Sequence, residues 1–205
     1  MIPNESVLNK IGQIKGNDRA AFSIEALVIL IKMVDLSYER LFYLLKKKEQ
    51  ALSEDISMHA WLVVGNMNRL RCLIDKVSGI KKSEPWFQSF TRKVKIVEKT
   101  RHIIEHYDGQ INSLQQNVKP LLGHISWVEY LNDGTFKIQL LLPGTIKKYK
   151  GLGLVNPLGM PARAEIDHIN YYLGDESLDL SDLYYATLAF TRELEGYVKK
   201  TYFTK

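Results

Sequence analysis

Apolar side chains recur every three or four residues along the first half of the chain, the spacing of one face of an α-helix. A first helix is predicted from about residue 20 to residue 48, and a second from residue 53 to about residue 77. The first helix also carries apolar residues outside this face, such as Ile29 and Leu30. A helix apolar over most of its circumference is typical of a bundle centre or of a surface covered by a partner subunit. The faces comprise Leu27, Ile31, Val34, Tyr38, Leu41 and Leu45 in the first helix and Ile56, Ala60, Val63, Met67, Leu70, Ile74 and Val77 in the second.

A third helix is predicted to begin at Pro85, because proline is favoured in the first turn of a helix. Its apolar spacing places Arg101 at a position that should face the core. Unpaired charge in a core is costly, so we expect Arg101 to face a cleft, a subunit interface or an anion. The helix ends near Gly109 or continues to about residue 118. The apolar positions before Arg101 are Phe87, Phe90, Val94 and Val97.

The pattern changes to that of β-structure after residue 120. Residues 125–130 and 135–142 are rich in strand-forming side chains, and Asn132-Asp133-Gly134 between them is typical of a hairpin turn. Residues 165–173 fit a strand or a helical turn, of which we favour the strand. The intervening residues 144–161 are rich in glycine and predict a long loop.

A last helix is predicted from Ser181 to about Thr201. Short connections between the first three helices favour antiparallel neighbours. The sequence therefore predicts a mainly α protein, a four-helix up-and-down bundle with a small β-hairpin-containing insertion between the third and fourth long helices. The insertion spans about residues 121–178, within one domain covering residues 1–205.

Composition narrows the class of protein only slightly. The net charge of +5 mildly favours anionic partners such as nucleic acid. The one cysteine, Cys72, falls in an apolar helical pattern and is expected to be a buried thiol. The first 16 residues lack the order of a signal peptide, and the most apolar run is too short to cross a membrane. We therefore expect a cytoplasmic protein without a membrane partner.

The stretch that can carry chemistry is Arg101-His102-Ile103-Ile104-Glu105-His106. His102 and His106 are four residues apart, so they share one face of a helix. Arg101 and His106 are five apart, which separates them by about 140° around the axis. One regular helix cannot aim both at the same atom. Two copies related by a two-fold axis could do so, and so could a local break near the helix end, which Gly109 would favour.

These residue types suit cleavage of an RNA phosphodiester. A neutral histidine can accept the proton of a ribose 2′-hydroxyl, and a protonated one can donate a proton to the leaving 5′-oxygen. Arginine offers a planar fork of donors to the phosphate. The attacking group would be the 2′-hydroxyl itself, so no cofactor, metal or protein nucleophile is expected.

Arg101-His102-x-x-x-His106 resembles the motif of HEPN-domain proteins, in which an arginine and a polar residue precede a histidine late in the third helix of a four-helix bundle. The resemblance covers roughly residues 20–110 and 178–202. It implies a homodimeric, metal-independent endoribonuclease with a site shared by two copies, often a toxin or defence protein with a neutralising protein partner. Arg101 would then orient phosphate, His106 would be the acid or base, and His102 would position them. Tyr107 directly follows His106, whereas a subset of the family has a tyrosine two residues after the histidine.

Other interpretations remain open from the sequence. Glu105 and Tyr107 beside the motif are candidate binding residues, as are Lys147, Lys148 and Lys150 in the predicted loop. A non-catalytic dimeric module that binds a nucleotide, RNA or a protein is the alternative function. Arg101 and Glu105 could instead form an ion pair on a solvated helix face. The two histidines could bind zinc together with Glu105, His124 or His168, although His168 and Asp167 are equally expected to be surface residues.

Overall fold

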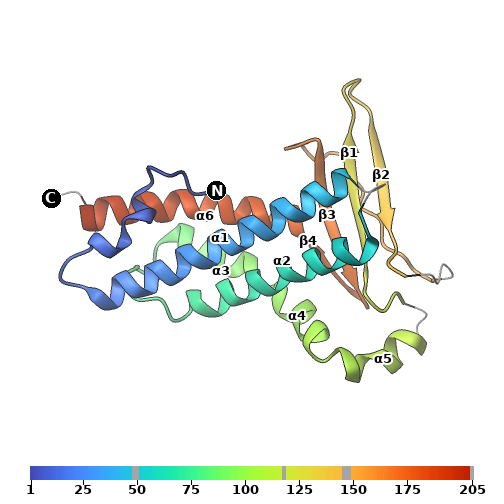
Figure 1. Cartoon of the computed structure of the whole chain (residues 1–205), viewed down its shortest axis with the longest axis horizontal. Helices are drawn as coiled ribbons and strands as arrows, with labels where there is room; N and C mark the ends of the chain where they lie inside the picture. Colours follow the sequence, from blue (N-terminus) through green and yellow to red (C-terminus); the bar gives the residue numbers. More distant parts are fainter. Residues whose placement is uncertain (48–50, 117–118, 145–148, 204–205) are drawn as a thin grey trace.

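The computed structural model describes residues 1–47, 51–116, 119–144 and 149–203 and is mainly helical, with a small four-stranded antiparallel sheet (Figure 1). Two short 3-10 turns, at Val7–Asn9 and Ile11–Gln13, precede the long helices. A π-helical turn at Lys199–Phe203 follows the last one. The α-helices are α1 (Asp18–Lys46), α2 (Ser53–Ile74), α3 (Pro85–Val94), α4 (Val97–Glu105), α5 (Tyr107–Gln116) and α6 (Leu180–Val198).

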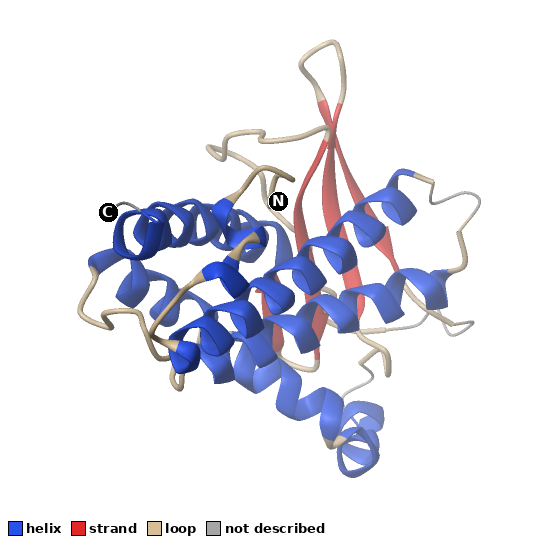
Figure 2. Ribbon diagram, turned by 60° about the vertical axis from the view of Figure 1, so that its left-hand side comes forward, coloured by secondary structure: helices blue, strands red, loops and turns tan. Residues whose placement is uncertain are grey.

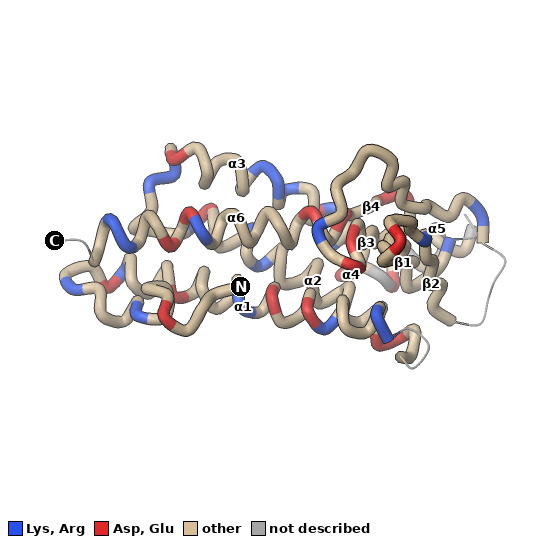
Figure 3. The backbone as a smooth tube through the Cα atoms, turned by 90° about the horizontal axis from the view of Figure 1, so that it is seen from above, with Lys and Arg blue, Asp and Glu red and all other residues tan. Residues whose placement is uncertain are grey.

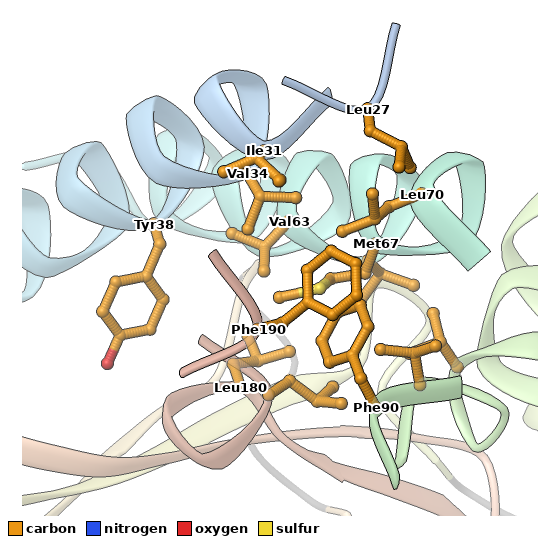
Figure 4. Close-up of a cluster of buried hydrophobic side chains, with 14 of the residues drawn as sticks. Leu27, Ile31, Val34, Tyr38, Val63, Met67, Leu70, Phe90, Leu180 and Phe190 are labelled. Atoms are coloured by element: carbon orange, nitrogen blue, oxygen red, sulfur yellow. The ribbon is translucent and has the colours of Figure 1, made fainter. Parts of the chain in front are cut away.

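The helical core forms where the predicted apolar faces of α1 and α2 meet α3 and α6. Every position predicted for the faces of α1 and α2 is buried. Figure 4 shows side chains from α1, α2, α3 and α6 converging, among them Ile31, Met67, Phe90 and Phe190. The side chain of Asn17 begins α1 by accepting a hydrogen bond from the Ala20 N–H at 3.1 Å. The apolar spacing of the sequence therefore places the core correctly.

The third predicted helix is not continuous. It is interrupted at Lys95–Ile96 and again at His106, which gives the separate helices α3, α4 and α5. Of the two helix ends left open by the sequence, the one near Gly109 is wrong, since Gly109 lies inside α5 and the break comes at His106. Helical structure continues to Gln116, and the alternative end near residue 118 lies outside the described residues. The second break falls on His106, a residue of the candidate motif.

The three predicted strands are confirmed, and a fourth is added. The strands are β1 (His124–Tyr130), β2 (Phe136–Leu141), β3 (Ile166–Leu173) and β4 (Glu176–Asp179), in the order β2-β1-β3-β4. The sheet stands beside the C-terminal end of α1 and the N-terminal end of α2 (Figure 2). A bulge interrupts the pairing of β1 with β3 between Ser126 and Val128.

One buried hydrogen-bonded joint connects the sheet with the helices. The Ser181 hydroxyl at the start of α6 lies 2.8 Å from the Tyr38 hydroxyl of α1 and accepts from the Ile169 N–H of β3 at 2.9 Å. The Tyr38 ring also stacks on Tyr184 of α6, with 3.9 Å between the centroids. Buried polar groups need such partners, so this joint fixes how β3 meets α1 and α6.

Asp167 and His168 are not surface residues, in contrast to the expectation from sequence. The Asp167 carboxylate is buried and accepts hydrogen bonds from the backbone N–H and the side chain of Arg163 and from the N–H of His168. His168 lies in the bulge with a φ of 51°, which non-glycine residues rarely adopt. The pairing of Asp167 with Arg163 attaches the segment before β3 to the sheet.

Two further observations concern sequence expectations. Cys72 is exposed on α2, so the expectation of a buried thiol is wrong. In the described part of the chain, no helix is long and apolar enough to span a bilayer.

We predict that Asp167 makes stability depend on acid. Burial by itself raises the pKa of the Asp167 carboxyl, but the hydrogen bonds from Arg163 and the His168 N–H outweigh burial and hold the pKa below its usual range. A carboxyl with a lowered pKa stabilises the fold above its unfolded pKa of about 3.9, and this contribution disappears as pH falls through the folded pKa. Asp167→Asn should therefore lower the free energy of unfolding by about 3 kcal/mol at neutral pH, measured by urea denaturation.

The difference between wild type and Asp167→Asn should shrink as the pH falls below about 4. Asp175→Asn is the matched control, since the Asp175 side chain is almost fully exposed. This substitution should barely change the free energy of unfolding at either pH. A difference between wild type and Asp167→Asn that does not change with pH would contradict this role.

Candidate functional site

Helix α4 carries most of the motif and packs against α2 and β4. Val97 and Thr100 are its buried residues, while Ile103 and Ile104 are half-buried against the core. The sequence pattern wrongly assigned the core-facing position to Arg101. Because α4 is a separate short helix after the break at Lys95–Ile96, it need not continue the phase of α3, and Thr100 faces inward instead.

The elbow between α4 and α5 rests on the turn that joins β3 to β4. Gly174 in this turn has a φ of 62°, and a Cβ there would lie 3.9 Å from Ile103 of α4 and 3.6 Å from Leu114 of α5. Lys99 of α4 also lies 3.9 Å from the Glu176 carboxylate of β4. The sheet therefore supports both helices that flank His106.

Arg101 and Glu105 form an i,i+4 ion pair along the outer side of α4. Their side chains are 42% and 38% exposed. An ion pair this open contributes only a few tenths of a kcal/mol, because water and salt screen it. Within one chain the two residues thus form the solvated ion pair that was one of the alternative interpretations of the sequence.

His102 and His106 lie side by side at the end of α4. Their ring centroids are 4.5 Å apart, and both residues are exposed. His106 ends the helix with a φ of −108° and a ψ of 34°, while its N–H donates to the His102 carbonyl at 3.1 Å. One chain therefore presents two neighbouring imidazoles to solvent, with the Arg101–Glu105 pair on the adjoining stripe of the helix.

The other candidate residues are only partly placed. Tyr107 begins α5, but its side chain lies outside the described residues, as do Lys147 and Lys148 altogether. Lys150 is exposed in its loop. The neighbouring Gly151 carbonyl accepts from Lys119 at 3.4 Å, and Lys119 also lies 3.6 Å from Asp175 in the β3–β4 turn. The loop and the α4–α5 elbow thus meet the same turn of the sheet.

A metal centre at the motif gains no support from the geometry. Across the described residues, no group of three or more His, Cys, Asp or Glu side chains could hold a metal ion. His124 is buried in β1, with its Nε2 3.1 Å from the Gly153 carbonyl. His168 is buried in β3. Both histidines are thus buried in the sheet, whereas His102 and His106 are exposed at the end of α4.

Comparisons with family models, with curated proteins and with solved structures find no match to this chain. The function must therefore be argued from the site itself.

We predict that Arg101 contributes little to folding and that Thr100 contributes much. Arg101→Ala should change the free energy of unfolding by less than about 0.5 kcal/mol, because it removes only an exposed ion pair. Thr100→Lys should cost more than about 2 kcal/mol, because it places a charge between α4, α2 and β4. Urea denaturation followed by tryptophan fluorescence measures both. A larger loss from Arg101→Ala than from Thr100→Lys would show that α4 is turned as the sequence pattern first suggested.

Proposed function

We propose that this chain is a metal-independent endoribonuclease of the HEPN type. In this proposal α1, α2, α3 with α4, and α6 correspond to the four-helix up-and-down bundle of that family, and the sheet is the insertion. The observation that carries the proposal is the pair of exposed imidazoles of His102 and His106, 4.5 Å apart beside Arg101. Two exposed imidazoles this close can contact the same phosphodiester, one as general base and the other as general acid.

Such a pair suits cleavage of RNA by transfer of the phosphoryl group to its own 2′-oxygen. The neutral imidazole accepts the 2′-hydroxyl proton while the 2′-oxygen bonds to phosphorus. The bond from phosphorus to the 5′-oxygen breaks, and the protonated imidazole donates its proton to that oxygen. The products are a 2′,3′-cyclic phosphate and a 5′-hydroxyl. We assign the acid and the base to His102 and His106 together.

Arg101 would bind the phosphate in place of its present partner. The exposed Arg101–Glu105 pair is weak, so a phosphate that offers two oxygens to the guanidinium can displace the Glu105 carboxylate. Glu105 then acts as a competitor that keeps Arg101 positioned when no RNA is bound. The net charge of +5 and the exposed Lys150, next to the Gly151 that accepts a hydrogen bond from Lys119, favour approach of an anionic substrate.

The break at His106 supports a site contained in one chain. His106 lies outside the regular helix, so it need not point about 140° away from Arg101, as residues five apart in an ideal helix do. The resemblance implies instead a site shared across a homodimer, in which one copy supplies Arg101 and the other supplies the histidines. These two versions of the proposed nuclease make opposite predictions for mixed dimers. A toxin or defence role with a neutralising protein partner belongs to either version.

We predict RNA cleavage in the presence of EDTA, with 2′,3′-cyclic phosphate ends. His106→Ala and His102→Ala should each lower the rate by about 100-fold or more, because each removes a general acid or base. His59→Ala, a histidine of α2, is the control and should keep the activity. Cleavage is measured on a labelled single-stranded RNA, and circular dichroism confirms that each variant is folded.

Activity that survives His106→Ala, or that needs a divalent metal, would contradict the nuclease. RNA binding without any cleavage by a folded wild type would favour the second candidate, a non-catalytic module that binds a nucleotide, RNA or a protein. The observation that favours this candidate is the Arg101–Glu105 ion pair, in which a carboxylate already occupies the guanidinium that would bind the phosphate.

We predict further that Arg101→Ala and His106→Ala do not complement each other. If each chain holds a complete site, a co-expressed mixture of the two variants contains no chain with both residues and stays as inactive as either alone. Recovery of activity in the mixture, against a control mixture of His102→Ala with His106→Ala, would instead establish the shared site.

A further inference from the structure

A second apolar stripe runs along α1 on the side that faces solvent. Its positions are spaced alternately by four and three residues, which is the heptad seam of a coiled coil. Seen from above, α1 forms one outer edge of the molecule and α3 the other, with α6 between them (Figure 3). Phe22 is 75% and Leu36 67% exposed. The complete stripe is Phe22, Ala26, Ile29, Met33, Leu36, Arg40 and Tyr43.

The exposed apolar surface continues from α1 onto α2. Asn66 of α2 donates to the Met33 carbonyl at 3.3 Å, and the exposed Leu62 precedes Asn66 by one helical turn. Gly65 lies between them, and a Cβ on Gly65 would meet no atom within 4 Å. Glycine in a helix interior costs about 1 kcal/mol relative to alanine, so it needs a reason that the chain itself does not supply. Close approach of another helix is such a reason.

The charges on the stripe indicate what that other helix is. Arg40 lies over the Tyr43 ring at 5.4 Å and forms no ion pair with a carboxylate in the described part of the chain. Glu25 is exposed beside the stripe and likewise has no ion pair among the described residues. Met33 is the middle of the stripe, with Glu25 eight residues before it and Arg40 seven residues after it. The stripe is therefore self-complementary when two copies run in opposite directions.

We propose that a second copy of this chain covers the stripe, with the two α1 helices antiparallel about a two-fold axis near Met33. Arg40 of one copy then meets the small Ala26 and the carboxylate of Glu25 on the other. Phe22 and Tyr43, at opposite ends of the stripe, come together in the same way. Parallel packing would place Arg40 against Arg40 and Glu25 against Glu25, which like-charge repulsion disfavours.

This dimer keeps the two motifs apart. Helix α2 lies between α1 and α4, and the α4–α5 elbow projects on the far side of α2 (Figures 1 and 2). Dimerisation about a two-fold axis on α1 therefore does not bring the two His106 side chains together. The inference is independent of the proposed nuclease, because oligomeric state is measured without any RNA.

Sedimentation equilibrium of the full chain at high micromolar concentration tests the interface. The wild type should have the mass of a dimer, and Leu36→Glu should have half that mass, because a carboxylate would be buried in the seam. Leu158→Glu is the matched control, since Leu158 is 76% exposed in the loop and lies outside the stripe. It should stay dimeric. A monomeric wild type, or a Leu36→Glu variant that remains fully dimeric, would overturn the proposal.

Charge exchange tests the antiparallel direction. Glu25→Arg and Arg40→Glu should each weaken the dimer by about 10-fold or more, since each places like charges opposite one another. The double variant should recover most of the wild-type affinity. In a parallel dimer each single variant would only replace one pair of like charges with another, so a dimer that neither Glu25→Arg nor Arg40→Glu weakens would indicate parallel helices and contradict the proposed geometry. Circular dichroism of each variant shows whether the helices remain folded, so loss of the dimer is distinguished from loss of the fold.

Discussion

The packing of α4 is the constraint on which the candidate site depends. A helix of this length has one side to bury, and the side that holds Val97 and Thr100 meets α2 and β4. Arg101 and Glu105 then lie on the outer side and pair with each other, while His102 faces solvent. The break after Glu105 leaves His106 beside the His102 ring. Burial of two small side chains therefore determines which groups of the motif are exposed to solvent.

The sheet takes part in this arrangement although it carries none of the motif. Gly174 lets the β3–β4 turn support Ile103 and Leu114 on either side of the elbow. The same sheet is fixed to the helices through Tyr38, Ser181 and the Ile169 N–H. Burial raises the pKa of the Tyr38 hydroxyl far above its usual range, so this group stays neutral and keeps its hydrogen bond. The sheet thus supports α4 and α5 from the side of the β3–β4 turn.

Residue patterns in the sequence predicted the helices and strands that depend on residues close together in the chain. They placed the buried faces of α1 and α2 from their three- and four-residue spacing, and the first three strands were placed from their strand-forming side chains. They missed the break at Lys95–Ile96, which no glycine or proline marks, and so assigned Arg101 to the wrong side. They also missed β4, which is short and polar and is held by its pairing with β3. The burial of Asp167 was missed as well, because it depends on the hydrogen-bonded ion pair with Arg163. These features depend on tertiary contacts that spacing does not encode.

The proposed site places His102, His106 and Arg101 of one chain against a single phosphodiester. Proton NMR of the histidine rings during titration with a 2′-O-methyl RNA oligonucleotide tests it most directly, because such RNA binds but has no free 2′-hydroxyl to react. This arrangement predicts that the His102 and His106 signals shift together, that His59 does not shift, and that Arg101→Ala weakens the response. Saturable RNA binding that leaves the His102 and His106 signals unchanged would contradict it.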